Sequence, residues 1–164
     1  MDPKSLRVIK NIYDQIGFVI FDFFPELEGK EYNACQFTVN GRKVLCRNAK
    51  ITPKKKGQFV TFWKRLEKGS IAPFSDTDPI DFYIVNVSKE KFFGQFVFPK
   101  SVLIEKGIIT TESKEGKRAF RVYPKWDSPT NKQSIRTQKW QLKYFYEISK
   151  INNFDKIREL YNAR

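Results

Sequence analysis

The stretch from Arg47 to Arg65, RNAKITPKKKGQFVTFWKR, carries the densest set of side chains that could do chemistry. It begins as an apolar strand, breaks at Thr52-Pro53, passes three consecutive lysines and turns at Gly57 into a second apolar strand. Cations in a loop and at strand ends beside aromatic rings are typical of a surface that faces an anion. The alternative is a solvated turn, since runs of like charge are usually exposed to water. The candidate nucleic-acid-binding residues here are Arg47, Lys54, Lys55, Lys56, Lys64 and Arg65.

A second basic group is predicted on a long helix that Thr130 can cap and that continues to about Ser149. Its apolar face is supplied by Ile135, Leu142, Phe145 and Ile148. A basic stripe recurs at spacings of four, three and four residues and consists of Lys132, Arg136, Lys139 and Lys143. In a neutral protein this stripe would be an ordinary solvated face, whereas a net charge of +13 favours contact with phosphates.

The candidate catalytic residues depend on a predicted hairpin whose strands span 33–39 and 42–48. Asn40-Gly41 is the dipeptide favoured in a two-residue type I′ turn, and such a turn fixes the register of the two strands. Cys35 then faces Cys46 on an apolar face that points into the core. We expect both thiols to be buried and reduced, with a cross-strand disulfide as the alternative.

Continued outward, the same register places Asn33 opposite Asn48 and Glu31 opposite Lys50. Alternation puts all four side chains on one face of the sheet, at the open end of the hairpin. A lysine beside a carboxylate could hold a phosphate near a metal-bound water. Glu31, Asn33, Asn48 and Lys50 are therefore predicted to form one cluster. The alternative is a plain ion pair between Glu31 and Lys50, which contributes ~0.2–1 kcal/mol when exposed.

Mg²⁺ is the cofactor that this cluster could take, and Glu31 is its candidate metal ligand. Amide oxygens are poorer ligands than carboxylates, so one carboxylate with two amides makes a weak magnesium site unless Glu26 or Glu28 folds back to help. The sequence contains no histidine, which excludes His-based triads, His-ligated zinc and imidazole acid–base catalysis.

Composition limits the remaining possibilities. The chain has 164 residues, enough for one domain with a substantial core. The excess of 31 basic over 18 acidic residues indicates a polyanionic partner, most often nucleic acid and less often an anionic membrane surface. No apolar run approaches the roughly 20 residues of a membrane span, and the first residues lack a secretory signal pattern. We expect a cytoplasmic protein that does not insert into membranes.

The elements that must position these residues form an α/β (or α+β) fold. We expect one domain over residues 1–164, with a mixed central sheet and flanking helices. Helices are expected near the N-terminus, at 102–106 and at 154–161, and a further strand at 118–123. The predicted strands of the central sheet are 33–39, 42–48, 58–64, 80–87 and 94–98.

Four segments resemble the MepB-like family of bacterial proteins and together span most of the chain from about Glu31. They are RNAKITPKKKGQFVTFWKR, FGQFVFPKSVL, FRVYPKW and TQKWQLKYF. A weaker resemblance connects the same region with the PD-(D/E)xK nuclease core. Asn48-Ala49-Lys50 matches the strand of that core that carries Glu or Gln, any residue, then Lys, with Asn in the first place. Asn33 or Glu31 would match its acidic position, and of these only Glu31 is acidic. The resemblance therefore implies that Glu31, Asn33, Asn48 and Lys50 are the candidate catalytic residues.

The resemblance and the charge leave three functions open. The first is a nucleic-acid-binding protein on a nuclease-like scaffold whose catalytic site is degenerate or absent. The second is an active Mg²⁺-dependent nuclease that uses Glu31 and Lys50. The third is a regulatory protein-interaction module whose basic surface contacts an acidic protein. The sequence does not separate DNA from RNA, single from double strands, or one oligomeric state from another.

Overall fold

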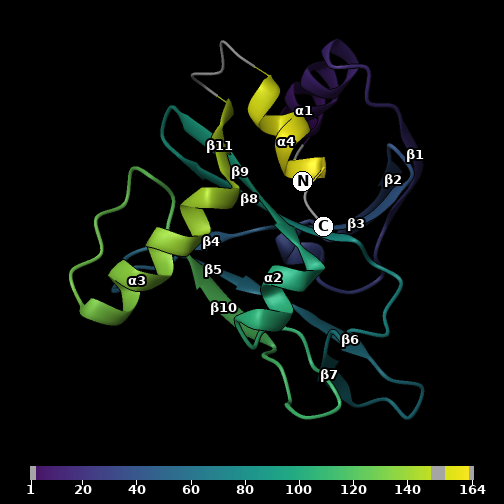
Figure 1. The fold of residues 1–164 in the computed structure, drawn as a ribbon, viewed down its shortest axis with the longest axis vertical. Helices are drawn as coiled ribbons and strands as arrows, with labels where there is room; N and C mark the ends of the chain where they lie inside the picture. The colour runs from purple at the N-terminus through teal and green to yellow at the C-terminus, as the bar shows by residue number, and fades with distance from the viewer. Residues whose placement is uncertain (1–2, 149–153, 163–164) are drawn as a thin grey trace.

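A six-stranded mixed sheet forms the centre of the molecule (Figure 1). The computed structural model describes residues 3–148 and 154–162. Along the sheet the strands follow the order β1 (Ile20–Pro25), β2 (Cys35–Val39), β3 (Arg42–Asn48), β8 (Phe82–Lys89), β9 (Phe92–Pro99) and β11 (Phe145–Glu147). β3 and β8 are parallel and the other neighbours are antiparallel. The expected single α+β domain with a mixed sheet and flanking helices is confirmed.

The β2–β3 hairpin has the register that its turn predicts. Asn40 and Gly41 both have positive φ angles, of 49° and 73°, as a type I′ turn requires. Cys35 lies opposite Cys46, and both thiols are buried and free. The predicted register and the buried state of the two cysteines are therefore confirmed.

Both faces of the central sheet are covered, which explains why β3 and β8 are apolar through most of their length. Helices α1 (Pro3–Gln15) and α4 (Asp155–Asn162) supply Tyr13 and Tyr161 to the core on one face, where they meet the two cysteines. On the opposite face Leu45 and Val85 pack with Val60 and other residues of a smaller sheet. That sheet contains β10 (Ala119–Val122), β5 (Gln58–Thr61) and β4 (Lys50–Ile51). It lies beside helices α2 (Lys100–Glu105) and α3 (Lys132–Gln141) (Figure 1).

The expected strand 58–64 is not part of the central sheet. Its first half is β5 at the middle of the smaller sheet, and its end is β6 (Trp63–Arg65), which pairs with β7 (Ile71–Pro73). Alternation of apolar residues correctly predicts that Val60 and Phe62 are buried. It carries no information about which strand lies alongside, because an inward-facing side chain fits the core from either sheet.

The long helix expected from Thr130 to Ser149 is shorter at both ends. Asn131 caps α3 through its side chain, which accepts a hydrogen bond from the Ser134 amide at 2.8 Å. A short 3-10 turn, η2 (Leu142–Tyr144), follows α3, and the chain then becomes strand β11 along β9. Phe145 and Tyr146 enter opposite cores of the central sheet, a burial that a continued helix would not provide. The expected end at Ser149 lies outside the described residues.

Candidate nucleic-acid interface

An arginine that the sequence reading did not single out holds the basic loop in place. Arg121, on β10, donates from Nη1 to the carbonyl oxygens of Lys56 at 3.1 Å and Gly57 at 3.4 Å, and from Nη2 to Thr52 Oγ1. Gly57 has a φ of 75°, and a Cβ at this position would lie 2.7 Å from the Tyr123 ring. The loop is therefore fixed at both ends while the lysine side chains between them remain exposed.

The side chains that reach solvent after this loop form an outer strip, which consists of the partly exposed Phe59, Thr61 and Trp63 and the exposed Arg65. The intervening side chains Gln58, Val60 and Phe62 are fully buried, so the strip follows from the period of two of an extended chain. The strip runs from β5 into β6, and its two aromatic rings are partly exposed. It therefore presents rings to solvent along the strand segment that follows the basic loop.

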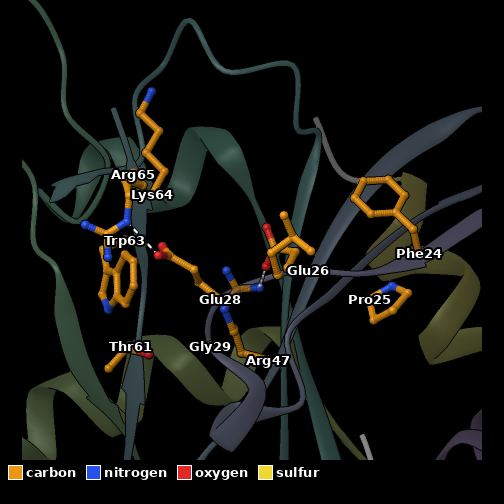
Figure 2. Close-up of a pocket in the computed structure, with 11 residues that line it drawn as sticks. Phe24, Pro25, Glu26, Glu28, Gly29, Arg47, Thr61, Trp63, Lys64 and Arg65 are labelled. Carbon is orange, nitrogen blue, oxygen red and sulfur yellow. Dashed lines mark hydrogen bonds and ion pairs between the residues drawn. The ribbon is translucent and has the colours of Figure 1, made fainter. Parts of the chain in front are cut away.

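Two hollows open onto the outer strip. The Phe59 hollow, of about 720 Å³, lies beside the loop and is lined by Pro53, Lys54, Lys55, Phe59, Phe120 and Arg121. The Trp63 hollow, of about 680 Å³, lies at the other end and is lined by Phe24, Leu27, Glu28, Trp63, Lys64 and Arg65 (Figure 2). Each hollow thus combines apolar or aromatic walls with cations.

Glu31 and Lys50 meet beside the strip. Lys50 Nζ lies 3.2 Å from Glu31 Oε2 and 4.5 Å from the centroid of the Tyr32 ring, which contacts Phe59. Burial raises the pKa of the Tyr32 hydroxyl while the charge of Lys50 acts in the opposite direction. Tyr32 therefore remains a neutral hydrogen-bonding group at physiological pH.

The expected ladder that would align Glu31, Asn33, Asn48 and Lys50 in facing pairs is wrong. The β2–β3 pairing ends at Cys35 and Cys46. Glu31 lies in a 3-10 turn, η1 (Lys30–Tyr32), and Asn33 ends this turn with a φ of 47°. Lys50 has already entered the smaller sheet, where it pairs with Phe59. The contact between Glu31 and Lys50 therefore arises from η1 and β4, and not from hairpin register.

Asn48 belongs to a different, buried group. Its Oδ1 accepts a hydrogen bond from Asn86 Nδ2 at 3.0 Å, and Asn86 Oδ1 accepts from Gln95 Nε2 at 2.7 Å. Gln95 Oε1 in turn accepts from the hydroxyls of Tyr13 and Tyr146. This network joins neutral groups on the helix-covered face of the central sheet, where buried polar atoms must find partners. Asn48 therefore has a structural role in this hydrogen-bond network.

The acidic residues do not fit a magnesium site. Within residues 3–148 and 154–162, no group of three or more His, Cys, Asp or Glu side chains lies close enough together to hold a metal ion. The Glu31 side chain is 70% exposed and its charge is paired with Lys50. A protein-bound Mg²⁺ requires several fixed oxygen ligands, so Glu31 alone would hold it poorly.

Arg47 is buried beneath the interface, with an exposed fraction of 4%. Its Nη1 forms an ion pair with Glu26 Oε2 and donates to the Cys46 carbonyl at 3.1 Å, and its guanidinium lies 5.9 Å from the Phe74 ring centroid. Arg47 lines the Trp63 hollow, but its guanidinium is already paired there with Glu26 (Figure 2). We therefore remove Arg47 from the candidate set.

Lys64 and Arg65 remain at the rim of the Trp63 hollow, each with an acidic neighbour. Lys64 Nζ lies 2.6 Å from Asp78 Oδ1, and Arg65 Nε lies 2.6 Å from Glu28 Oε1 (Figure 2). The Arg65 and Glu28 side chains are each nearly half exposed, so this pair is weak and can exchange partners at little cost.

The basic stripe of α3 lies on the exposed side of that helix. Lys132, Arg136 and Lys139 lie in α3 and Lys143 lies in η2, and all four side chains are exposed. The inner side of α3 is fastened to β10 by Gln141, whose Oε1 accepts from the Tyr123 amide at 2.8 Å and whose Nε2 donates to the Arg121 carbonyl at 2.9 Å. Strand β10 therefore contacts both basic groups: Arg121 fixes the basic loop, and its carbonyl accepts a hydrogen bond from α3, the helix with the basic stripe.

Sequence reasoning missed Arg121, Tyr32 and Trp63 as members of the interface. The signal available for Arg121 was a charged residue inside the apolar strand RAFRVY, because such a residue usually has a partner. The signal for Trp63 was its odd-numbered place in the alternating run from Phe59 to Arg65. Tyr32 gave none, since its contact with Lys50 depends on the 3-10 turn.

These features define a class of protein: a single α+β domain whose basic, aromatic surface is built on a small second sheet. None of the helices in the described part of the chain is long and apolar enough to cross a membrane. A sequence profile described as MepB-like matches residues 26–147. The solved structure titled "Crystal Structure of MepB" is 39% identical, with a TM-score of 0.78, over 88% of this chain and 96% of that one. The chain belongs to the MepB-like family.

A second solved structure, of the bacterial homing endonuclease I-Ssp6803I, is similar at 14% identity and a TM-score of 0.46. That match covers 83% of this chain and 85% of the endonuclease chain. No curated protein matches the sequence.

Proposed function

We propose that the protein binds nucleic acid through the basic loop and the outer strip, and that it does not cleave what it binds. The observation that carries this proposal is the clamp made by Arg121, which fixes the loop so that Lys54, Lys55 and Lys56 extend beside the partly exposed ring of Phe59. Fixed cations beside an aromatic ring match the phosphate and the base of a nucleotide.

Charge supports a polyanionic ligand. The formal net charge is +13, and among the described residues none of the three loop lysines forms an ion pair with an acidic side chain. Three adjacent free cations on a fixed loop repel one another unless an anion lies between them. The stripe of Lys132, Arg136, Lys139 and Lys143 would extend the contact to phosphates farther along the ligand.

Binding without cleavage follows from the same residues. Lys50 supplies a cation beside the strip, but Glu31 is the one carboxylate paired with it. Phosphodiester hydrolysis of the metal-dependent kind needs a firmly held metal ion to activate water, and this donor set does not provide one. Lys50 is accordingly proposed as a phosphate contact. The free, buried thiols of Cys35 and Cys46 fit a reducing compartment, and we propose a cytoplasmic location.

Electrophoretic mobility of short DNA and RNA, single- and double-stranded, tests the proposal in the presence of Mg²⁺, Mn²⁺ or a chelator. We expect retardation in every buffer, with the oligonucleotide recovered intact. Replacing Lys54, Lys55 and Lys56 together by Ala should weaken retardation. The matched control replaces three exposed lysines that line neither hollow, Lys10, Lys43 and Lys68, and should weaken it less. Cleavage that requires the metal, or equal losses in the two variants, would contradict the proposal.

A further inference from the structure

We infer that the ligand is a single strand, and that the Trp63 hollow receives one unstacked base. This inference rests on the proposed nucleic-acid binding and adds the substrate class and a base-binding subsite. Its starting point is the position of Trp63 at the end of the outer strip, on the same extended run of chain as Phe59 and the basic loop.

The hollow has the size and the walls that a planar base requires. Its volume of about 680 Å³ lies within the range of small-molecule sites, and its surface is mainly apolar. Figure 2 shows Trp63 on one side of the hollow, below Lys64 and Arg65, with Phe24 and Pro25 on the opposite side. A base that enters would therefore exchange water for apolar and aromatic contacts.

Base stacking on Trp63 requires single-stranded nucleic acid, in which a base can leave the stack. The Trp63 indole is partly exposed, and the Arg65 guanidinium lies over its ring at 5.6 Å. A base that stacks on this face takes the place of Arg65, whose exposed pair with Glu28 exchanges partners at little cost. Such stacking is insensitive to sequence because every base has a π-face. In a duplex both faces of each base are already covered by its neighbours. The hollow therefore selects single strands, whereas the basic loop by itself would attract either form.

The polar groups at the rim suit a nucleotide more closely than a general anion. Arg65 lies over the Trp63 ring at 5.6 Å and also pairs with Glu28. With Lys64 it supplies cations at the mouth, where the phosphate of the bound nucleotide would lie. The Glu28 carboxylate accepts hydrogen bonds, which the exocyclic amino groups of adenine, cytosine and guanine donate. We therefore expect these bases to be preferred to thymine at this subsite.

The distance along the strip permits one strand to contact both ends. Phe59 and Trp63 are four residues apart on extended chain, which corresponds to about 13 Å. Cations lie at each end, with Lys54 and Lys55 beside Phe59 and with Lys64 and Arg65 beside Trp63. A nucleic-acid strand that follows the outer strip can thus place phosphates on both groups of cations and one base in the Trp63 hollow.

The test compares affinities for a labelled single strand of roughly 12 nucleotides, within the site sizes of single-strand binders, and for the same sequence as a duplex. For Trp63→Ala we expect the single-strand affinity to fall about 5- to 140-fold at an unchanged salt slope. Trp63→Phe keeps a stacking face and should retain most of the affinity. The control Phe21→Ala removes an exposed ring outside the hollow and should have no effect.

A second measurement does not depend on the folding of the alanine variant. Binding of unlabelled single strand should quench part of the tryptophan fluorescence of the native protein. In Trp63→Phe, in which Trp126 and Trp140 remain, that quenching should disappear while binding persists. A preference for oligo(dA) or oligo(dC) over oligo(dT) should be lost in Glu28→Ala, which removes the acceptor oxygens.

The outcomes separate this inference from the proposed function. Retention of single-strand binding in Trp63→Ala, or equal affinity for duplex and single strand, overturns the inference while leaving nucleic-acid binding intact. Absence of binding to any oligonucleotide overturns both. Competition by polyglutamate as strong as that by the oligonucleotide would identify an acidic protein as the occupant and would also overturn both.

Discussion

The ion pair of Glu26 with Arg47 gives a sharp test of the fold beneath the interface. Arg47 lies on β3 with its side chain 5% exposed, and the Glu26 side chain is 18% exposed. Gln36 also donates to Glu26 Oε1 at 2.9 Å. Glu26→Gln keeps the shape of the side chain and removes its charge, so the buried guanidinium loses its counter-charge.

The expected cost follows from burial. Breaking a buried ion pair by removing one partner destabilises proteins by about 3–5 kcal/mol, and the partial exposure of Glu26 favours the lower end, about 3 kcal/mol. For a chain of this size each kcal/mol lowers the thermal midpoint by about 2–4 °C, so Glu26→Gln should lower it by roughly 6–12 °C. Circular dichroism during heating measures the midpoint, and urea unfolding measures the free energy.

The matched control is Glu28→Gln, in the neighbouring pair with Arg65. Both side chains of that pair are more than 40% exposed, so the cost should be about 0–1 kcal/mol. The double variant Glu26→Leu with Arg47→Met removes both charges and should recover most of the stability. Equal losses in Glu26→Gln and Glu28→Gln would refute the burial of Arg47 and would return it to the candidate interface.

Three further results are expected. Gly57→Ala should destabilise the protein by about 1–3 kcal/mol in urea unfolding, because its positive φ disfavours a side chain and the added methyl would lie 2.7 Å from a tyrosine ring; an unchanged midpoint would contradict the loop conformation. The hydrogen bond between the two thiols lowers the pKa of Cys35, whereas that bond and burial raise the pKa of Cys46 well above its ordinary value. Because both thiols are buried, iodoacetamide should label both far more slowly in the native protein than in urea, and equal rates would count against the hairpin core. Lys50→Ala should weaken oligonucleotide binding more than Lys43→Ala, because Lys43 is exposed on the β2–β3 hairpin and lines neither hollow. The reverse order would exclude Lys50 as a phosphate contact.

The β2–β3 hairpin could be predicted from the sequence because the residues that determine its turn and register are adjacent in the chain. Asn40-Gly41 determines the turn, and the turn determines that Cys35 faces Cys46. The same reasoning wrongly continued the pairing beyond Cys35 and Cys46. The 3-10 turn η1 and the left-handed conformation of Asn33 end the ladder there. No sequence signal indicated where the pairing would stop.

Features that depend on distant partners were not predictable in the same way. Phe145 has the spacing of a helical apolar face, yet its neighbour Tyr146 donates to Gln95 across the sheet and this stretch becomes β11. Arg47 was a candidate for binding nucleic acid as part of the basic stretch, and its burial depends on Glu26 from another segment. The basic loop itself was predicted, whereas its clamp by Arg121 depends on the pairing of β10 with β5.

The most direct test of the account is the salt dependence of single-strand affinity in the native protein and in the variant with Lys54, Lys55 and Lys56 all replaced by Ala. Each phosphate contact contributes roughly 0.7–0.9 to the slope of log K against log salt concentration, so three lost contacts should flatten it by about 2–3. The native protein should show the steeper slope, and the control with Lys10, Lys43 and Lys68 replaced should keep it. An identical slope in the native protein and the loop variant, or no binding at low salt, would contradict the claim that this surface binds nucleic acid.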